Sequence, residues 1–185
     1  LGGAPVRDVR REDERIVHVL AAAPQGDPLA ARIDWARRWD FMQQHTGQHM
    51  LSNVLLAVCG APTVSVHLGD DLSTIELDVT TIADSALAAA EDRAAELIAA
   101  DLPVTARWVD DDELAGLALR RPTARKGRVR LVEIGDVDRV ACGGLHVTRT
   151  AELQLVRLAR VERIRGRLRT HWKIGRRALL DYRRC

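Results

Sequence analysis

Apolar and polar residues alternate in two short stretches near the start of the chain, and this alternation predicts two β-strands. The stretches are Val6–Val9 and Ile16–Leu20, and the charged run Arg10–Glu14 between them predicts a turn. A loop is predicted at Ala23–Asp27, where glycine and proline gather. Because two strands alone cannot bury a stable core, we expect residues 1–34 to be a partial N-terminal β unit, such as a truncated barrel.

A helical period follows. From about Trp39 to Val58, apolar residues and two histidines recur at spacings of three and four, which is typical of one helix. Asp40 is suited to the beginning of this helix and Gly60 to its end. A second helix, rich in alanine, is predicted over Ile82–Ala100.

The remaining alternating segments predict an antiparallel sheet. Helices follow pairs of strands and do not alternate singly with them, which favours an α+β two-layer sandwich with a largely antiparallel sheet over a doubly wound fold. We expect this second domain to cover residues 35–185, with Leu114–Leu119 fitting neither state clearly. The predicted strands are Thr63–Leu68, Thr74–Val79, Val104–Val109, Val129–Ile134, Val137–Val140, Leu153–Val161 and Leu168–Ile174, and a short helix is predicted at Gly175–Tyr182.

Composition adds an expectation about location. An apolar fraction of 46% and a charged fraction of 29% are those of a globular protein, and no apolar run approaches the roughly 20 residues that span a bilayer. The beginning of the sequence also lacks the basic and apolar segments of a signal peptide. Three cysteines without regular spacing, Cys59, Cys142 and Cys185, make a poor disulfide framework. We therefore expect a cytoplasmic protein that has no membrane partner.

Positive charge is concentrated although the net charge is only +2. Arginine and lysine gather within Arg120–Arg130 and again from Arg157 onward. Such stretches either form a solvated surface or follow a phosphate backbone, and composition alone leaves both interpretations open.

Two segments carry candidate metal ligands. His45 and His49 stand at positions i and i+4, so a helix would place both imidazoles on one face. Cys142 and His146 flank the glycines of Cys-Gly-Gly-Leu-His, whose tight turn would direct both side chains toward one point. Together they supply three nitrogens and one sulfur, a suitable set for tetrahedral zinc. Four protein ligands are typical of a structural site and an open position is typical of a catalytic one, so the pattern leaves both roles open.

These residues resemble a known family. The run from His45 to Ser52, together with Ala141–Val147, is similar to the two signature motifs of the alanyl-tRNA synthetase editing domain and of its free-standing AlaX-type relatives. Further similarity lies at Ile33–Arg38, at His67–Ile75 and at Val161–Gly166. The resemblance covers nearly the whole chain, and motifs in this order and at this separation are specific.

The resemblance implies a zinc-dependent aminoacyl-tRNA deacylase that removes serine or glycine wrongly attached to alanine tRNA. It assigns the zinc ligands to His45, His49, Cys142 and His146, so the long helix would be a zinc-binding helix. The ion would activate water, or polarise or position the substrate, and the sequence leaves these roles open. Further candidates are Gln48 and Thr46 as substrate contacts, Gly143, Gly144 and His67 for substrate binding, and Arg125, Lys126, Arg128 and Arg165 for tRNA binding.

Two departures from the family pattern affect this interpretation. Leu145 stands where the family commonly has threonine, which puts amino-acid selectivity in doubt more than zinc binding. The first β unit is shorter than in the family, and there is no aminoacylation domain, so we expect a fragment of a longer protein or a trimmed free-standing editor. Two alternatives remain: a zinc-stabilised tRNA-binding module without activity, and editing of another mischarged tRNA such as threonine tRNA. The oligomeric state is left open.

Overall fold

The structure is a computed structural model that describes residues 1–183, so Cys185 lies outside the described residues. The chain divides into two compact units, Leu1–Arg38 and Trp39–Cys185, which are described separately. Within residues 1–183, no helix has the length and apolar character needed to cross a membrane.

The first unit contains one β-hairpin. Strands β1 (Val6–Glu12) and β2 (Arg15–Leu20) pair antiparallel, so both predicted strands are confirmed and are longer than expected. Asp13 has a φ of 53° in the two-residue turn, a conformation that aspartate tolerates better than most residues. The turn is therefore tighter than the charged run Arg10–Glu14 predicts.

Helix α1 (Trp35–Cys59) begins earlier than the periodicity predicts. The reason is Asp34, whose side-chain Oδ1 accepts a hydrogen bond from the backbone N–H of Arg37 at 3.1 Å and so caps the first turn. Asp40, expected near the helix start, lies inside the helix. Its carboxylate accepts hydrogen bonds from Arg177, one of them at 2.6 Å.

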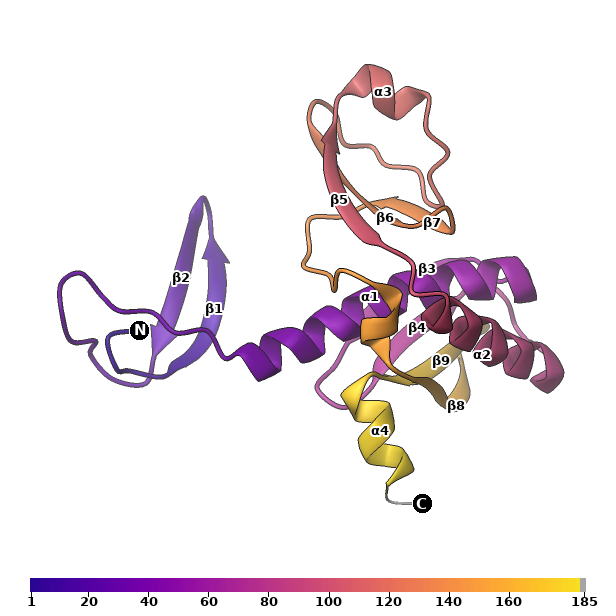
Figure 1. The fold of residues 1–185 in the computed structure, drawn as a ribbon, viewed down its shortest axis with the longest axis horizontal. Coiled ribbons are helices and arrows are strands. Elements are labelled where there is room, and N and C mark those ends of the chain that lie inside the picture. The colour runs from indigo at the N-terminus through magenta and orange to yellow at the C-terminus, as the bar shows by residue number, and fades with distance from the viewer. Residues whose placement is uncertain (184–185) are drawn as a thin grey trace. The chain divides into compact units, whose positions relative to one another are not determined.

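The second unit contains two antiparallel sheets, with strand orders β3-β4-β9-β8 and β5-β6-β7. Figure 1 shows α1 crossing this unit, with the four-stranded sheet on one side and the three-stranded sheet on the other. The expected α+β class with antiparallel sheets is confirmed. The elements are β3 (Thr63–Leu68), β4 (Ser73–Leu77), α2 (Asp84–Ala99), β5 (Val104–Val109), α3 (Asp111–Ala115), β6 (Val129–Ile134), β7 (Asp138–Ala141), the 3-10 helix η1 (Thr150–Leu153), β8 (Val156–Ile164), β9 (Arg167–Ile174) and α4 (Arg176–Tyr182).

One predicted strand begins too early. The sequence predicts a strand from Leu153, but residues 150–153 form η1 and β8 starts at Val156. Thr150 explains the difference, because its hydroxyl donates to the carbonyl of Leu97 at 2.7 Å and accepts from the N–H of Leu102 at 2.8 Å. These bonds hold the segment against the end of α2, out of the sheet.

The middle of α1 is surrounded by protein. Every residue from Thr46 to Ser52 is buried, including Met50 and Leu51 in the main core. Gly47 lets α1 pack closely on β9, because a Cβ built on it would lie 2.7 Å from Cγ2 of Ile174. The helix that carries His45 and His49 is therefore fixed from several sides.

Replacing Gly47 with alanine is expected to destabilise the fold, although alanine normally favours a helix by about 1 kcal/mol. The added methyl would overlap Ile174, and overpacking a core of this kind costs about 1–3 kcal/mol. Urea unfolding of both proteins measures the difference. An unchanged or higher unfolding midpoint in the Gly47→Ala variant would contradict the close packing of α1 on β9.

Candidate metal centre

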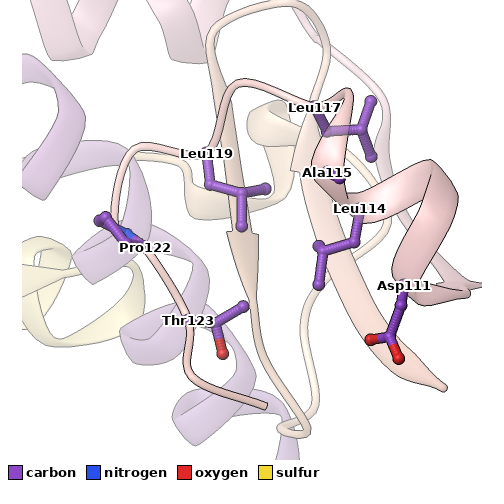
Figure 2. Close-up of a pocket in the computed structure, with 7 residues that line it drawn as sticks. All are labelled: Asp111, Leu114, Ala115, Leu117, Leu119, Pro122 and Thr123. Carbon is purple, nitrogen blue, oxygen red and sulfur yellow. The ribbon is translucent and has the colours of Figure 1, made fainter. Parts of the chain in front are cut away.

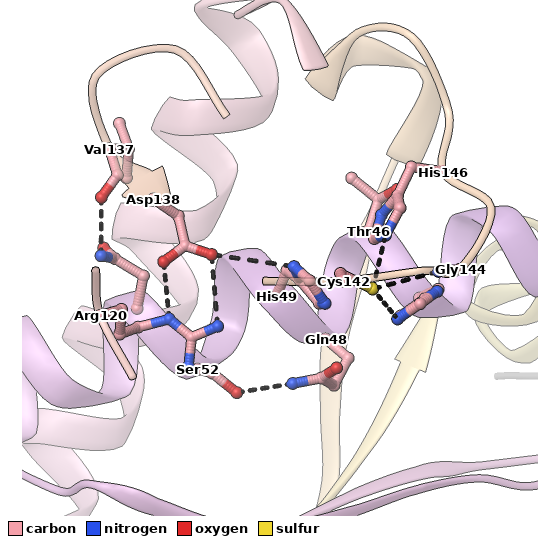
Figure 3. Close-up of polar contacts among 12 residues, drawn as sticks. Thr46, Gln48, His49, Ser52, Arg120, Val137, Asp138, Cys142, Gly144 and His146 are labelled. Carbon is pink, nitrogen blue, oxygen red and sulfur yellow. Dashed lines mark hydrogen bonds and ion pairs between the residues drawn. The ribbon is translucent and has the colours of Figure 1, made fainter. Parts of the chain in front are cut away.

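Four potential metal ligands converge between α1 and the segment that follows β7. One ligand atom from each of His45, His49, Cys142 and His146 lies within 4.8 Å of the others. Sγ of Cys142 is 3.4 Å from Nε2 of His45 and 3.5 Å from Nε2 of His146. Figure 3 shows the sulfur of Cys142 beside the imidazole of His146. Donor atoms at this spacing can bind one ion after small shifts of the side chains.

The loop that carries Cys142 is shaped by glycine and by an arginine. The N–H of Gly144 points at Sγ of Cys142 at 3.4 Å. Nη1 of Arg130 donates to the carbonyls of Cys142 and Gly144 at 2.9 and 2.8 Å. Gly144 also lies against His45, since a Cβ there would be 2.1 Å from the ring carbon Cε1. The loop therefore fits against the ligand helix only with glycine at this position.

Two of the imidazoles are oriented through their second nitrogen. Nδ1 of His45 lies 3.2 Å from the carbonyl oxygen of Leu145, and Nδ1 of His146 lies 3.1 Å from Oγ1 of Thr46. Thr46 also accepts a hydrogen bond from the N–H of Val147. A partner on Nδ1 fixes the ring and leaves Nε2 for a metal, as is usual for histidine ligands.

The electrostatic environment keeps the histidines neutral. Burial lowers the pKa of His49 to about 2, and the charges of His146, His45 and Arg120 add to this effect. Burial likewise lowers the pKa of His146 to about 3 and lowers the pKa of His45. Neutral imidazoles offer lone pairs to a cation at neutral pH, and three of them beside a thiol are a donor set suited to a borderline-soft metal ion.

Behind His49 lies a buried ion pair that sequence reasoning missed. The side chain of Asp138 on β7 is fully buried, and its two oxygens accept hydrogen bonds from Arg120 at 2.6 and 3.3 Å. Burial raises the pKa of Asp138, and the bonds from Arg120 oppose that shift. The alternation of β7 was a usable signal, because it places Asp138 on the same buried face as Val140.

The other predicted site residues differ in their surroundings. Gln48 is buried and its amide donates to Ser52 Oγ at 2.8 Å, and Thr46 is fully buried behind His146. Gly143 is open, with nothing within 4 Å of an added Cβ. His67 is exposed on the edge strand β3. We call His45, His49, Cys142 and His146 the His/Cys group. Of the residues just described, Thr46 has a hydrogen bond from its side chain to a member of this group, His146.

The side chains of the basic segment Arg120–Arg130 differ in the direction they face. Its two ends, Arg120 and Arg130, turn inward and bind Asp138 and the glycine loop. Arg125 and Lys126 between them are exposed. The remaining predicted tRNA contacts are exposed too: the guanidinium carbon of Arg128 lies 5.7 Å from the ring centroid of Trp108, and Arg165 occupies the β8–β9 turn.

A separate pocket of about 450 Å³ lies beside α3 and the following loop. Figure 2 shows apolar side chains lining most of it. Its single carboxylate, that of Asp111, already accepts hydrogen bonds from the N–H of Gly127. None of the lining residues belongs to the His/Cys group. The pocket is lined by Asp111, Leu114, Ala115, Leu117, Leu119, Pro122 and Thr123.

Comparison with known proteins gives a consistent result. Residues 129–169, which include Cys142 and His146, match the family described as the threonyl and alanyl tRNA synthetase second additional domain. The chain is 34% identical over 167 residues to alanyl-tRNA editing protein Aarsd1 of Danio rerio, covering 88% of this chain and 40% of that protein. It is 38% identical over 141 residues to the Bos taurus protein of the same name, covering 75% of this chain and 32% of that protein.

A synthetase is similar as well. The alanine–tRNA ligase of Pyrobaculum neutrophilum is 32% identical over 176 residues, covering 88% of this chain and 20% of the ligase. The chain thus spans less than half the length of the relatives that it matches. Cys142 and His146 lie inside the segment that matches the family model, whereas His45 and His49 lie before it. Over 88% of its length, the chain is therefore similar to an alanyl-tRNA editing protein and to an alanine–tRNA ligase, and its residues 129–169 carry the match to the second additional domain of threonyl and alanyl tRNA synthetases.

Proposed function

We propose that this chain hydrolyses the ester that joins serine or glycine to alanine tRNA, and that it does so in trans with one zinc ion. The observation that carries the proposal is the convergence of three neutral imidazoles and one cysteine within 4.8 Å, in a chain that is similar to alanyl-tRNA editing proteins. Related proteins named for alanyl-tRNA editing support the substrate. We place this activity in the cytoplasm.

The donor set favours zinc as the ion. Zinc prefers nitrogen and thiolate ligands in a tetrahedral arrangement, whereas magnesium and calcium prefer oxygen ligands. His45, His49, Cys142 and His146 would hold it. When bound, zinc would supply Lewis acidity for polarising the ester carbonyl or for lowering the pKa of a water molecule.

The surrounding residues would position the ester. The open backbone at Gly143 gives the terminal ribose room to approach the ligand group. Gly144 would keep the loop close to His45. Because Thr46 and Gln48 are buried and already hydrogen-bonded, we propose that Thr46 acts through His146 and that Gln48 reaches the substrate only after releasing Ser52. His67 on β3 would contact a more distant part of the substrate.

Two alternatives make different predictions for one experiment. Purified protein is incubated with alanine tRNA that carries serine, glycine or alanine, and with threonine tRNA that carries serine. We expect loss of the seryl or glycyl ester on alanine tRNA, with the alanyl ester preserved, and no loss after chelation or in Cys142→Ala. Hydrolysis confined to threonine tRNA would show that the substrate is different. Binding without any hydrolysis would identify a zinc-stabilised tRNA-binding module and overturn the proposed activity.

The exposed basic residues predict how tRNA binds. Each phosphate contact that is lost reduces the slope of log affinity against log salt concentration by about one, because about one counterion fewer is released on binding. Exchanging Arg125 and Lys126 for glutamate is therefore expected to weaken tRNA binding about tenfold or more at physiological salt and to reduce its salt slope. Arg93→Glu on α2, which removes the ion pair with Glu96, is the control. Equal affinities for the double variant and the control would exclude the basic segment from the interface.

A further inference from the structure

His49 differs from the other two imidazoles of the ligand group in how its second nitrogen is placed. His45 and His146 each have a partner on Nδ1, the carbonyl of Leu145 and the hydroxyl of Thr46. Nδ1 of His49 is buried and has no hydrogen-bond partner among the described residues. A buried N–H without a partner costs about 1–3 kcal/mol, so such an atom calls for an explanation.

An acceptor lies in the direction of that nitrogen. Oδ2 of Asp138 is 3.9 Å from Nδ1 of His49, with both side chains almost fully buried. Figure 3 shows the His49 ring between the carboxylate of Asp138 and the sulfur of Cys142. The distance exceeds a hydrogen bond by about 1 Å, which a small tilt of the ring would close.

Arg120 makes this carboxylate a fixed acceptor. Nε and Nη2 of Arg120 donate to separate oxygens of Asp138, as in a fork-shaped arginine–carboxylate pair. The pair neutralises a charge that burial would otherwise penalise. It also leaves lone pairs on Oδ2 that Arg120 does not use. The fold brings these groups together from three separate segments: α1, β7 and the basic segment.

We propose that Asp138, held by Arg120, is the positioning residue for His49 in the metal site. Nδ1–H of His49 donates to Oδ2 of Asp138, so the ring presents Nε2 to the ion. A carboxylate partner fixes the tautomer and makes the imidazole a stronger ligand. This inference rests on the proposed zinc site and adds a residue that acts on the metal only through His49.

Zinc affinity tests the proposal without reference to catalysis. Metal-free protein is titrated with zinc against a competing chelator. Loss of such a partner typically costs 10–100-fold in metal affinity, so Asp138→Asn is expected to raise the zinc dissociation constant by about that factor. The matched control is Glu133→Gln on β6, which also removes a carboxylate paired with arginines, Arg107 and Arg139. Its dissociation constant should stay within about threefold of the parent, well below that range.

A second variant separates positioning from charge. Asp138→Asn leaves Arg120 unpaired near the ion, and its charge would repel zinc. The double variant Asp138→Asn with Arg120→Gln removes that charge and should still bind zinc at least about tenfold more weakly than the parent. Recovery of the parent's affinity in the double variant would overturn the positioning role.

The unaltered protein supplies a readout that does not depend on folding of the variants. Nitrogen-15 NMR of the zinc-loaded chain should show His49 protonated at Nδ1, with that proton slow to exchange. A His49 protonated at Nε2 would overturn the inference even if every variant failed to fold. If the unaltered chain binds no zinc, the proposed function fails. If it binds zinc as tightly as Asp138→Asn, only the role of Asp138 fails.

Discussion

Alanine in place of His45, His49 or Cys142 is expected to reduce bound zinc well below one ion per chain and to abolish deacylation. Each change removes one of four donor atoms that converge within 4.8 Å. Removing a direct ligand should lower zinc affinity by more than the roughly 10–100-fold that follows from removing a hydrogen-bond partner of a ligand. Metal analysis of the purified variants and deacylation of seryl alanine tRNA measure the two effects.

Cys59→Ala provides the matched control for the cysteine. Cys59 is also a free thiol, and it donates to the carbonyl of Ala86 at the beginning of α2, at a distance of 3.5 Å. This variant should keep its zinc and its activity. Full zinc occupancy in Cys142→Ala, or equal losses in both cysteine variants, would contradict the assigned ligands.

Gly144→Ala is expected to damage the site almost as severely although it changes no ligand. The added Cβ would lie 2.1 Å from Cε1 and 2.5 Å from Nδ1 of His45, so the ring or the loop must move. A displacement of about 1 Å is enough to disturb a catalytic geometry by about 100-fold. We expect weaker zinc binding and a deacylation rate lowered by at least that factor.

The neighbouring glycine is a close control. A Cβ on Gly143 would have nothing within 4 Å, so Gly143→Ala should keep the metal and the folded structure. If Gly143 admits the ribose, its alanine variant would raise KM and leave zinc affinity unchanged. Equal zinc affinity in the two alanine variants would show that the loop does not pack against His45 as the structure has it.

Periodicity was sufficient to predict most of the elements. Alternation predicted the strands of both sheets, and in β4 buried residues alternate with partly buried ones. Strand β6 has buried apolar residues on both faces, since Val132 lies in the main core and Leu131 lies in a second cluster. The i and i+4 spacing predicted that His45 and His49 share a helix face. The predictions were wrong at the ends of some elements, where a single side chain sets the boundary. Asp34 caps α1 so that it begins earlier than predicted, and Thr150 holds the segment before β8 so that this strand begins later than predicted.

The surroundings of the site were harder to predict. Arg120 and Arg130 look like members of one basic surface in the sequence, yet both turn inward. Thr46 was a candidate substrate contact, and it lies buried behind His146. In each case the partner comes from a distant segment, so no local pattern reveals whether the side chain faces solvent or a buried group.

The sequence by itself determined the types of the candidate ligands, their pairing within each motif and the family that these motifs resemble. Those properties are local, because a helical period and a glycine turn act over a few residues. Only the tertiary structure decided that the two pairs meet, and that Asp138 and Arg120 lie behind His49. That outcome depends on packing α1 between two sheets, where burial sets the charge state of each imidazole and the side chains that can orient it.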